Sequence, residues 1–576
     1  MTEHLIDQAR YWLSIDPDEA TRAELTEIIS RAEAQDSEAI ADLQDRFSGT
    51  LQFGTAGLRA ALGAGPMRMN RVVVRRAAVG LAAYISGRAT AEGWESPSAV
   101  VGFDARFNSD IFAQETAAIF EAAGIKTKLM PAPLPTPVLA WATREYGAEV
   151  GVMVTASHNP PQDNGYKVYL GGQAVEEHAR GAQIVPPFDS DIAAAIAGVD
   201  DAAIELAAEG WQVLPGSVAD DYVAAVGALA QPAERDLKIV YTAMHGVGGE
   251  TVLKVLKNAG FESVTPVAEQ FDPDPLFPTV SFPNPEEPGA LDLAFKVAER
   301  EQADLIIAND PDADRAAFAV FDPAVKTWRA LRGDEIGSLL GVATLQRLGD
   351  TSQQNPKPIF ANSVVSSRQL GAIARAAGLE HRETLTGFKW IARIENLAYG
   401  YEEAIGYSVD PASVKDKDGV SAALAVAIYA QQLKREGKTL LTVLDELAAE
   451  HGVYATDQVS IRVDDLSQIT TMMATLRATP PASLAGSPVT EVIDMSQGTE
   501  TLPPTNGMMY LAADGTRVIV RPSGTEPKLK CYLEVIREVE AKPADSQPQE
   551  ALAQARTQAT TALKQVADEI RAALGL

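Results

Sequence analysis

Residues 150–160 read VGVMVTASHNP, and the fold that we predict follows from this stretch. Its first five residues are apolar and largely β-branched, which predicts a short buried strand. The strand must end there, because the polar residues Ser157 and His158 follow it and Pro160 has no N–H group for a sheet. A serine on a sharp polar loop at a strand end occupies the usual place of a reactive group in an α/β domain. The alternative interpretation is an Asn-Pro turn with a solvated serine.

The composition narrows the class of protein. The chain has 576 residues, too many for one hydrophobic core, and its 46% hydrophobic and 22% charged residues are typical of a soluble protein with several domains. A net charge of −29 argues against nucleic-acid or membrane binding, so an anionic substrate would need clustered Arg and Lys. The single cysteine, Cys531, excludes an intrachain disulfide and indicates a reducing compartment. We find no signal segment or membrane span and expect a cytoplasmic protein.

Short β-branched strands alternate with helices along most of the chain, which predicts largely parallel sheets in three α/β domains. The last part differs and predicts an α+β domain. We place the domain boundaries at 1–219 (with N-terminal helices), 220–325, 326–451 and 452–576.

Two further segments have a distinct composition. Residues 171–218 are Ala-rich with interspersed acids and predict added helices. The Pro-rich interval 272–288 predicts an irregular surface loop.

The loop DPDADR at 310–315 directly follows a predicted strand at 304–308. Asp310, Asp312 and Asp314 stand at alternate positions and can turn their carboxylates toward one point. Hard oxygen ligands of this kind suit Mg²⁺. An EF-hand would need flanking helices and a glutamate at its twelfth position, and an acidic turn without a cation would be costly when packed, so we predict a metal site.

The loop RPSGTEP at 521–527 follows a strand predicted at 517–520. An arginine, two hydroxyl groups and a glycine that lets backbone N–H groups approach form a suitable cradle for a phosphate group. The alternative is a simple Pro-Gly turn. Lys528 and Lys530 add positive charge against the acidic background.

Four weaker signals remain open from the residues alone. Glu402 and Glu403 stand between glycines, where their carboxylates could accept hydrogen bonds from sugar hydroxyls or simply face solvent. The KDKDG run at 415–419 predicts a solvated helix start with an anion contact at Lys417. Lys389 stands between aromatic residues, and Arg59 follows two glycines; each has a structural alternative.

Together these loops closely resemble the α-D-phosphohexomutase family, which includes phosphoglucomutases and phosphomannomutases. The resemblance covers about residues 50–540 and rests on TASHNP at 155–160, DPDADR at 310–315, EEAIGY at 402–407 and RPSGTEP at 521–527. Each motif alone is weak, but their joint occurrence in this order is highly specific. The resemblance implies four domains around a central cleft.

The resemblance also implies a role for each site residue. Ser157 would carry the transferred phosphate, and Mg²⁺, one per active site, would be held by Ser157, Asp310, Asp312 and Asp314. Lys167 would transfer a proton or position an oxygen. The residues expected near the transferring phosphate are His158, Arg315 and Lys389. Those expected to bind the substrate are Arg59, Glu402, Glu403, Lys417, Arg521, Ser523, Gly524 and Thr525.

The implied activity is an isomerase reaction of carbohydrate metabolism, the interconversion of hexose 1-phosphate and hexose 6-phosphate. It would proceed through a phosphoserine and a sugar 1,6-bisphosphate, which also serves as activator. We favour glucose, then mannose. Ala404 stands where a serine is common in hexomutases. EEAIGY, KDKDG and FGTAGLR resemble more closely the branch that contains phosphopentomutases and actinobacterial-type phospho-sugar mutases, so ribose phosphate is the alternative. A non-catalytic sugar-phosphate sensor and a phosphatase are alternatives of other classes. We expect a monomer or dimer without nucleic-acid or membrane partners.

Overall fold

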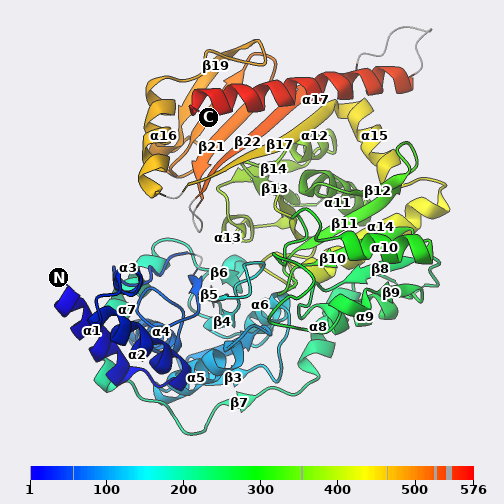
Figure 1. Cartoon of the computed structure of the whole chain (residues 1–576). Coiled ribbons are helices and arrows are strands. Elements are labelled where there is room, and N and C mark those ends of the chain that lie inside the picture. Colours follow the sequence, from blue (N-terminus) through cyan, green and yellow to red (C-terminus); the bar gives the residue numbers. More distant parts are fainter. Residues whose placement is uncertain are drawn as a thin grey trace. The chain divides into compact units, whose positions relative to one another are not determined.

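The structure is a computed structural model that describes residues 2–55, 57–231, 233–351, 354–463, 465–523, 528–539 and 548–575 (Figure 1). The chain forms two compact units. Unit 1 contains Met1–Ala330, Ala392–Glu395 and Gly406–Ile428, and unit 2 contains Leu331–Ile391, Asn396–Ile405 and Tyr429–Leu576. No helix in the described ranges combines the length and apolar character that crossing a bilayer requires.

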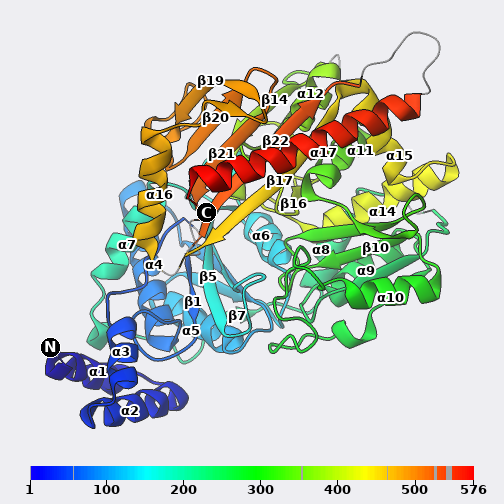
Figure 2. The same ribbon diagram turned by 45° about the horizontal axis from the view of Figure 1, so that its top comes forward.

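Unit 1 begins with three amphipathic helices, as predicted: α1 (Thr2–Ile15), α2 (Glu19–Glu33) and α3 (Ser37–Arg46). Figure 2 shows them packed beside one another. Asp18 and Asp36 cap α2 and α3 by accepting hydrogen bonds from backbone N–H groups of the first turn. The Trp12 and Phe47 rings meet edge to face at 6.2 Å, which holds the first helix against the end of the third.

The first sheet of unit 1 has the strand order β1-β5-β4-β2-β3-β7, with β6 paired to β5. The strands β4, β2, β3 and β7 are parallel, whereas β1, β5 and β6 pair antiparallel. The strands are β1 (Leu58–Ala61), β2 (Ser98–Phe103), β3 (Lys126–Leu129), β4 (Val150–Val154), β5 (Asp163–Leu170), β6 (Ala182–Gln183) and β7 (Gln212–Val213). The helices are α4 (Arg71–Glu92), α5 (Ser109–Ala122), α6 (Thr136–Glu145), α7 (Phe188–Ala197) and α8 (Val218–Gly227).

The prediction of purely helical additions at 171–218 was wrong in part. The segment contributes α7 and also two strands of two residues each. In the first sheet, β6 pairs with β5 and β7 pairs with β3. These strands are too short for an alternating pattern to be visible in the sequence. Their pairing depends on the neighbouring strand rather than on their own residues.

The second sheet of unit 1 has the order β12-β11-β10-β8-β9, in which β8, β9 and β10 are parallel and β11 and β12 return antiparallel. Its strands are β8 (Ile239–Thr242), β9 (Val264–Pro266), β10 (Leu305–Asn309), β11 (Ala316–Asp322) and β12 (Thr327–Ala330). Its helices are α9 (Gly249–Asn258) and α10 (Asp292–Glu301). The segments 392–395 and 406–428 also belong to unit 1 and supply β16 (Gly406–Ser408) and the start of α14 (Gly419–Arg435).

Unit 2 contains the third sheet, in which β13 (Ile359–Ser363) pairs in parallel with β14 (Glu380–Thr384) and β15 (Leu397–Glu402). The helices of this part are α11 (Gly333–Leu348), α12 (Gln369–Ala376), α13 (Phe388–Ile391) and α15 (Leu440–His451). Thr439 begins α15 with a capping box that it forms with Thr442.

The fourth sheet is wholly antiparallel, with the order β17-β22-β21-β20-β19-β18. Its strands are β17 (Val453–Arg462), β18 (Ser483–Leu484), β19 (Ser487–Asp494), β20 (Met508–Ala512), β21 (Arg517–Pro522) and β22 (Lys528–Arg537). Helix α16 (Leu466–Ala478) and the long α17 (Pro548–Ala573) accompany it, and Figure 1 shows α17 lying along β17 and β22. The predicted fold class, three α/β parts with mixed sheets and a C-terminal α+β part, is confirmed.

Candidate active site

Ser157 lies on the loop that follows β4, as the sequence predicts. Its φ of 53° is in the left-handed region, which is uncommon for a residue other than glycine. The Ser157 hydroxyl donates a hydrogen bond of 2.9 Å to Asp310 Oδ2 and accepts one of 3.0 Å from Arg315 Nη1. The serine is only 2% exposed, so the alternative of a solvated turn residue is wrong.

The three aspartates among the predicted metal ligands lie on the turn between the antiparallel strands β10 and β11. Asp310, Asp312 and Asp314 are buried, and one oxygen from each lies within 4.8 Å of the others. Asp312 Oδ1 and Asp314 Oδ1 are buried and have no hydrogen-bond partner among the described residues. Buried carboxylate oxygens without donors are costly, and hard oxygen donors suit a divalent cation, so these residues fit a metal ion.

Two lysines lie beside the carboxylates. Lys167 Nζ lies 2.7 Å from Asp312 Oδ2 and 2.9 Å from Asp314 Oδ2, and Lys417 Nζ lies 3.2 Å from Asp314 Oδ2. Burial alone would lower the pKa of Lys167, but the two carboxylates outweigh it and raise the pKa. Burial likewise opposes the lysines at Asp314, yet the pKa of that carboxyl is lowered. Lys167 therefore keeps its charge.

Asp310 differs from the other two carboxylates. Burial, followed by the charges of Asp312 and Asp314, raises the pKa of Asp310 well above its usual range. Neither lysine lies within ion-pair distance of it in the described structure, and its nearest cation is Arg315, at 3.7 Å. A bound cation would relieve this repulsion.

The expectation of a solvated KDKDG run was wrong. Lys415, Asp416, Lys417 and Asp418 are all less than 10% exposed. Asp416 accepts a hydrogen bond of 2.8 Å from the Tyr169 hydroxyl, and Asp418 accepts one of 2.7 Å from the Tyr222 hydroxyl. These tyrosines are distant in sequence, so local polarity could not predict the burial.

His158 belongs to the serine loop, and Arg59 contacts it. Arg315 Nη1 lies 2.5 Å from His158 Nδ1, and Ser157 Oγ lies 3.4 Å from the same nitrogen. Burial, followed by the charges of Arg315 and Arg59, lowers the pKa of His158 well below its usual value, so the ring is neutral at pH 7. Arg59, on the edge strand β1, donates to Asn159 Oδ1 at 3.2 Å.

Unit 2 brings a second group of predicted residues together. The Arg521 side chain bonds to the Tyr532 hydroxyl, and both Glu402 and Glu403 lie close enough to influence the pKa of that tyrosine. Glu402 Oε1 accepts a hydrogen bond of 2.6 Å from the Gly387 N–H group, while Glu403 Oε2 accepts from the Ser366 and Ser363 hydroxyls at 2.8 and 3.2 Å. Glu403 thus already has intramolecular donors.

The remaining predicted residues have varied outcomes. Lys389 is half-buried on the one-turn helix α13 of unit 2. The Ser523 N–H group donates a hydrogen bond of 2.8 Å to Lys528 O and so connects the ends of the β21 and β22 strands. Gly524 and Thr525 lie outside the described residues.

Sequence reasoning missed three residues. Thr136, at the first position of α6, donates a hydrogen bond of 2.6 Å to Asp312 Oδ2, and a Pro-Thr pair before a helix was the available signal. Arg106 follows strand β2 and contacts the serine loop. Tyr532 joins the two predicted loops of unit 2 but is an ordinary strand aromatic in the sequence, so no signal existed.

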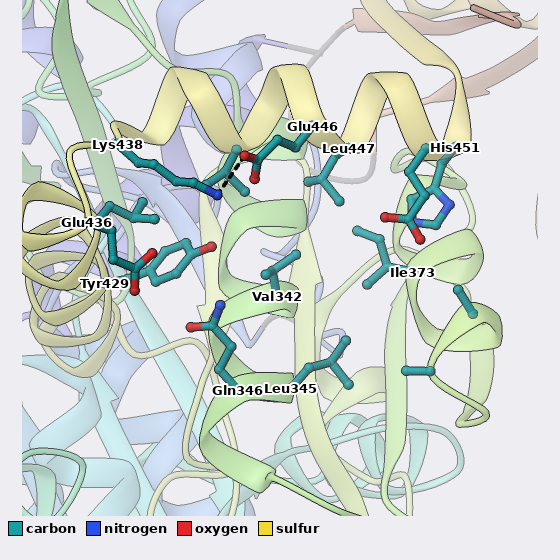
Figure 3. Close-up of a pocket in the computed structure, with 15 residues that line it drawn as sticks. Val342, Leu345, Gln346, Ile373, Tyr429, Glu436, Lys438, Glu446, Leu447 and His451 are labelled. Atoms are coloured by element: carbon teal, nitrogen blue, oxygen red, sulfur yellow. Dashed lines mark hydrogen bonds and ion pairs between the residues drawn. The ribbon is translucent and has the colours of Figure 1, made fainter. Parts of the chain in front are cut away.

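Unit 2 also has a pocket of about 350 Å³ between α11, α12, α15 and the end of α14 (Figure 3). Its lining is mostly apolar, and Lys438 and Glu446 form an ion pair of 2.7 Å on the side of α15. None of the predicted site residues lines this pocket. It is therefore separate from the chemistry described above.

Four family models match successive parts of the chain. They are described as phosphoglucomutase/phosphomannomutase alpha/beta/alpha domain I, at residues 50–200, domain II, at 220–322, domain III, at 332–451, and C-terminal domain, at 460–545. Together they cover most of the sequence and agree with the four sheets of the structure.

Individual relatives support the same family. A protein of Haemophilus influenzae named "Probable phosphomannomutase" is 47% identical over 83% of this chain and 95% of its own length. The phosphoribomutase of Saccharomyces cerevisiae is 35% identical over 92% of each chain. The crystal structure of a phosphoglucomutase/phosphomannomutase family protein from Burkholderia thailandensis has the same fold, with a TM-score of 0.64, 21% identity and coverage of 89% of this chain and 96% of its own. The chain therefore belongs to the α-D-phosphohexomutase (phosphoglucomutase/phosphomannomutase) family and is a phospho-sugar mutase.

Proposed function

We propose that the protein interconverts hexose 1-phosphate and hexose 6-phosphate, with glucose preferred and mannose second. Catalysis would use a phosphate group on Ser157 and a sugar 1,6-bisphosphate intermediate. One observation carries the proposal: the Ser157 hydroxyl lies 2.9 Å from Asp310, in a cluster of three carboxylates, two of which have an unpaired oxygen. A protein that only binds sugar phosphates has no need of a hydroxyl at such a position.

The cluster is suited to hold Mg²⁺. Asp310, Asp312 and Asp314 would be its protein ligands, together with the oxygen on Ser157. When bound, the ion neutralises charge on the oxygens of the phosphoryl group. The chain's own cations complete the charge balance, since Arg315 donates to Ser157 Oγ at 3.0 Å and Lys167 sits beside two of the carboxylates.

The proposed transfer moves one phosphoryl group from Ser157 to the sugar. The free hydroxyl oxygen of the sugar monophosphate forms a bond to phosphorus as the bond from phosphorus to Ser157 Oγ breaks, which yields the bisphosphate and a free serine. The net proton movement runs from the sugar hydroxyl to Ser157 Oγ, and we assign it to Lys167. After the intermediate turns around, its other phosphate returns to Ser157. Arg315 and His158 position the transferring group.

The substrate-binding roles are part of the proposal. We assign Arg521, Ser523, Gly524 and Thr525 to the phosphate that is not transferred, Glu402 to the sugar hydroxyls, Arg59 and Lys417 to further substrate contacts, and Lys389 to the transferring phosphate. Glu403 was predicted to bind substrate too. Because its carboxylate already accepts hydrogen bonds from Ser363 and Ser366, we propose instead that Glu403 helps to hold its neighbour Glu402 in position. The central cleft, the domain boundaries 1–219, 220–325, 326–451 and 452–576, a cytoplasmic location and a monomer or dimer stay predictions.

Phosphopentomutase activity is the second candidate. It is favoured by the relative named phosphoribomutase, which matches 92% of this chain, and by Ala404, which stands where many hexomutases have a serine. A substrate panel of glucose 1-phosphate, mannose 1-phosphate and ribose 1-phosphate, with and without sugar bisphosphate, decides between the two. A large preference for ribose 1-phosphate in kcat/KM would replace the hexose assignment.

Ser157→Ala tests the mechanism itself. We expect no turnover on any of the three sugars, and we expect native mass spectrometry to find a phosphate group on Ser157 of the wild-type chain only. Ser190→Ala, on the exposed start of α7, is the matched control and should retain wild-type turnover. Activity near the wild-type level in Ser157→Ala would contradict the phosphoserine mechanism.

A further inference from the structure

The serine loop is wrapped around one buried arginine. Arg106 is 4% exposed and follows strand β2. Its two terminal nitrogens donate to the backbone carbonyl oxygens of Ser157 (2.7 Å), Asn159 (2.6 Å), Pro160 (2.7 Å) and Asp163 (3.0 Å). A planar guanidinium with several fixed donors can serve four acceptors at once, whereas a lysine ammonium has three donors on a single nitrogen.

These four bonds explain how the loop keeps an unusual backbone. Ser157 has φ of 53°, a conformation that persists in a non-glycine residue only where the surroundings determine it. The Thr155 hydroxyl accepts from the Ser157 N–H group at 2.9 Å, and Arg106 holds the carbonyl of the same residue. The side chain of Ser157 is left to face Asp310 and Arg315.

The guanidinium is itself held from two directions. Arg106 Nε lies 3.4 Å from Asp104 Oδ2, and the backbone N–H group of Arg106 donates to Asp104 Oδ1 at 3.0 Å. The Phe277 ring covers the guanidinium, with Arg106 Cζ 5.0 Å from the ring centroid, a distance typical of a cation–π contact. Phe277 is 2% exposed.

Phe277 comes from the Pro-rich interval 272–288, which the sequence predicts to be a surface loop. The structure confirms an irregular and largely exposed loop, but Phe277 is buried and the loop is tied to the second sheet through Thr279. The Thr279 hydroxyl lies 2.8 Å from His245 Nε2 and accepts from Gln270 Nε2 at 2.9 Å, and Gln270 in turn accepts from Thr242, the last residue of β8, at 2.7 Å. The second sheet of unit 1 therefore places Phe277 on Arg106.

We propose that Arg106 and Phe277 are positioning residues of the mutase: Arg106 holds the loop 157–163 so that the Ser157 oxygen faces the carboxylates, and Phe277 keeps the guanidinium in place. This inference rests on the proposed role of Ser157 as the phosphate carrier. It adds that the loop 272–288, which supplies no reacting group, sets the geometry of that serine.

Arg106→Lys tests the first half, because it keeps the charge and removes the fork of donors. We expect kcat to fall about 100-fold, as a displacement of about 1 Å can cause, with KM changed by less than about twofold. Hydrogen–deuterium exchange of peptides that cover residues 155–165 should become faster. Added guanidinium should restore part of the kcat of Arg106→Ala and none of that of Ser157→Ala.

Arg46→Lys is the matched control. Arg46 is also mostly buried, with 11% side-chain exposure, and pairs with Glu24 and Asp42 away from the serine loop. Wild-type kcat together with wild-type exchange of the 155–165 peptides in Arg106→Lys would overturn the inference. Absence of mutase activity in the wild-type chain would refute the proposed function instead. In that case hydrogen–deuterium exchange of the 155–165 peptides in Arg106→Lys would still test whether Arg106 holds the loop.

Phe277→Leu tests the second half and covers the case in which Arg106→Lys does not fold. Leucine fills the space but offers no ring face to the guanidinium, so we expect kcat to fall about fivefold with KM unchanged. Exchange of the same peptides should rise, by less than in Arg106→Lys. Unchanged kcat and exchange in Phe277→Leu would remove Phe277 from the proposal.

Discussion

Each unit buries a cluster of charged side chains, and the two clusters differ in how their carboxylate oxygens are paired. In unit 1, Asp312 and Asp314 each have one buried oxygen without a hydrogen-bond partner in the described structure. In unit 2, Glu534 on β22 is 2% exposed, yet both of its oxygens accept hydrogen bonds.

The Glu534 network is complete within unit 2. Its Oε1 accepts from the Ser367 hydroxyl (2.9 Å) and from the Arg368 N–H group (2.8 Å), and its Oε2 accepts from Arg368 Nε at 2.5 Å. Arg517 Nη2 lies 3.4 Å from the same oxygen. Burial would raise the pKa of Glu534, but the two arginines outweigh it and lower the pKa.

The comparison separates two uses of a buried charge. A carboxylate whose oxygens are all paired contributes to stability and needs no ligand. Three carboxylates packed together repel one another, as the raised pKa of Asp310 indicates, and Asp312 and Asp314 each have an unpaired oxygen for a cation. The same substitution, acid to amide, should therefore affect activity in unit 1 and stability in unit 2.

The largest expected effect is on activity. Asp312→Asn should lower kcat about 1000-fold, because it removes both a proposed metal ligand and the partner of Lys167. Steady-state kinetics with the preferred sugar phosphate measure it. Asp7→Asn, whose side chain is 63% exposed on α1, is the control and should match the wild type. Full activity of Asp312→Asn would remove this loop from the catalytic site.

The next effect is on stability. Glu534→Gln should lower the free energy of unfolding by about 3 kcal/mol, because it removes the carboxylate partner of Arg368 and one of the two carboxylates beside the buried Arg517. Urea unfolding followed by circular dichroism measures the change, and kcat per folded molecule should be retained. Glu491→Gln, on the exposed face of β19, should leave the unfolding midpoint unchanged. A stable but inactive Glu534→Gln would reverse the assignment of this cluster.

Metal binding should distinguish the clusters without any measurement of activity. Mg²⁺ at about 100 times its dissociation constant should stabilise the wild-type chain by about 2.7 kcal/mol. The rise in melting temperature should be absent in Asp312→Asn and present in Glu534→Gln, while EDTA should return the wild type to its lower value. An equal rise in all three chains would mean that the ion binds elsewhere.

The smallest effect concerns Lys415, which is 8% exposed. Burial, followed by the charge of Arg144, lowers the pKa of Lys415 to about 8. The unfolded chain binds more protons than the folded chain between that value and the usual lysine pKa, so stability rises with pH across this window. Lys415→Met should stabilise the protein by about 3 kcal/mol at pH 7 and progressively less toward pH 10. Lys254→Met, with 51% side-chain exposure, should show no such pH dependence.

The sequence predicts the parts of the site that local rules govern. The strand predicted at 150–154 is β4, residue for residue, and Ser157 and the three aspartates lie on the loops that follow strands. Apolar β-branched runs end where polar residues or proline begin, so strand ends can be read without tertiary information.

The errors come from contacts between segments that are distant in sequence. Lys417 and its neighbours are charged and predict a solvated helix start, but tyrosines of β5 and α8 bury them. The Pro-rich interval 272–288 is the irregular surface loop that the sequence predicts, but its contact through Phe277 with Arg106 was missed. The residues of either segment do not indicate which distant side chains will contact it.

The sequence by itself determined which side chains stand at the ends of strands, and therefore the chemistry that the loops can offer. Only the tertiary structure decided which of those charges are paired, because pairing depends on donors from other elements. Thr136 and Lys167 both donate to one oxygen of Asp312, and its other oxygen has no hydrogen-bond partner among the described residues. Arg106 donates to backbone carbonyl groups of the serine loop. Strand ends follow from local backbone preferences, whereas the pairing of buried charges is a property of the packed core.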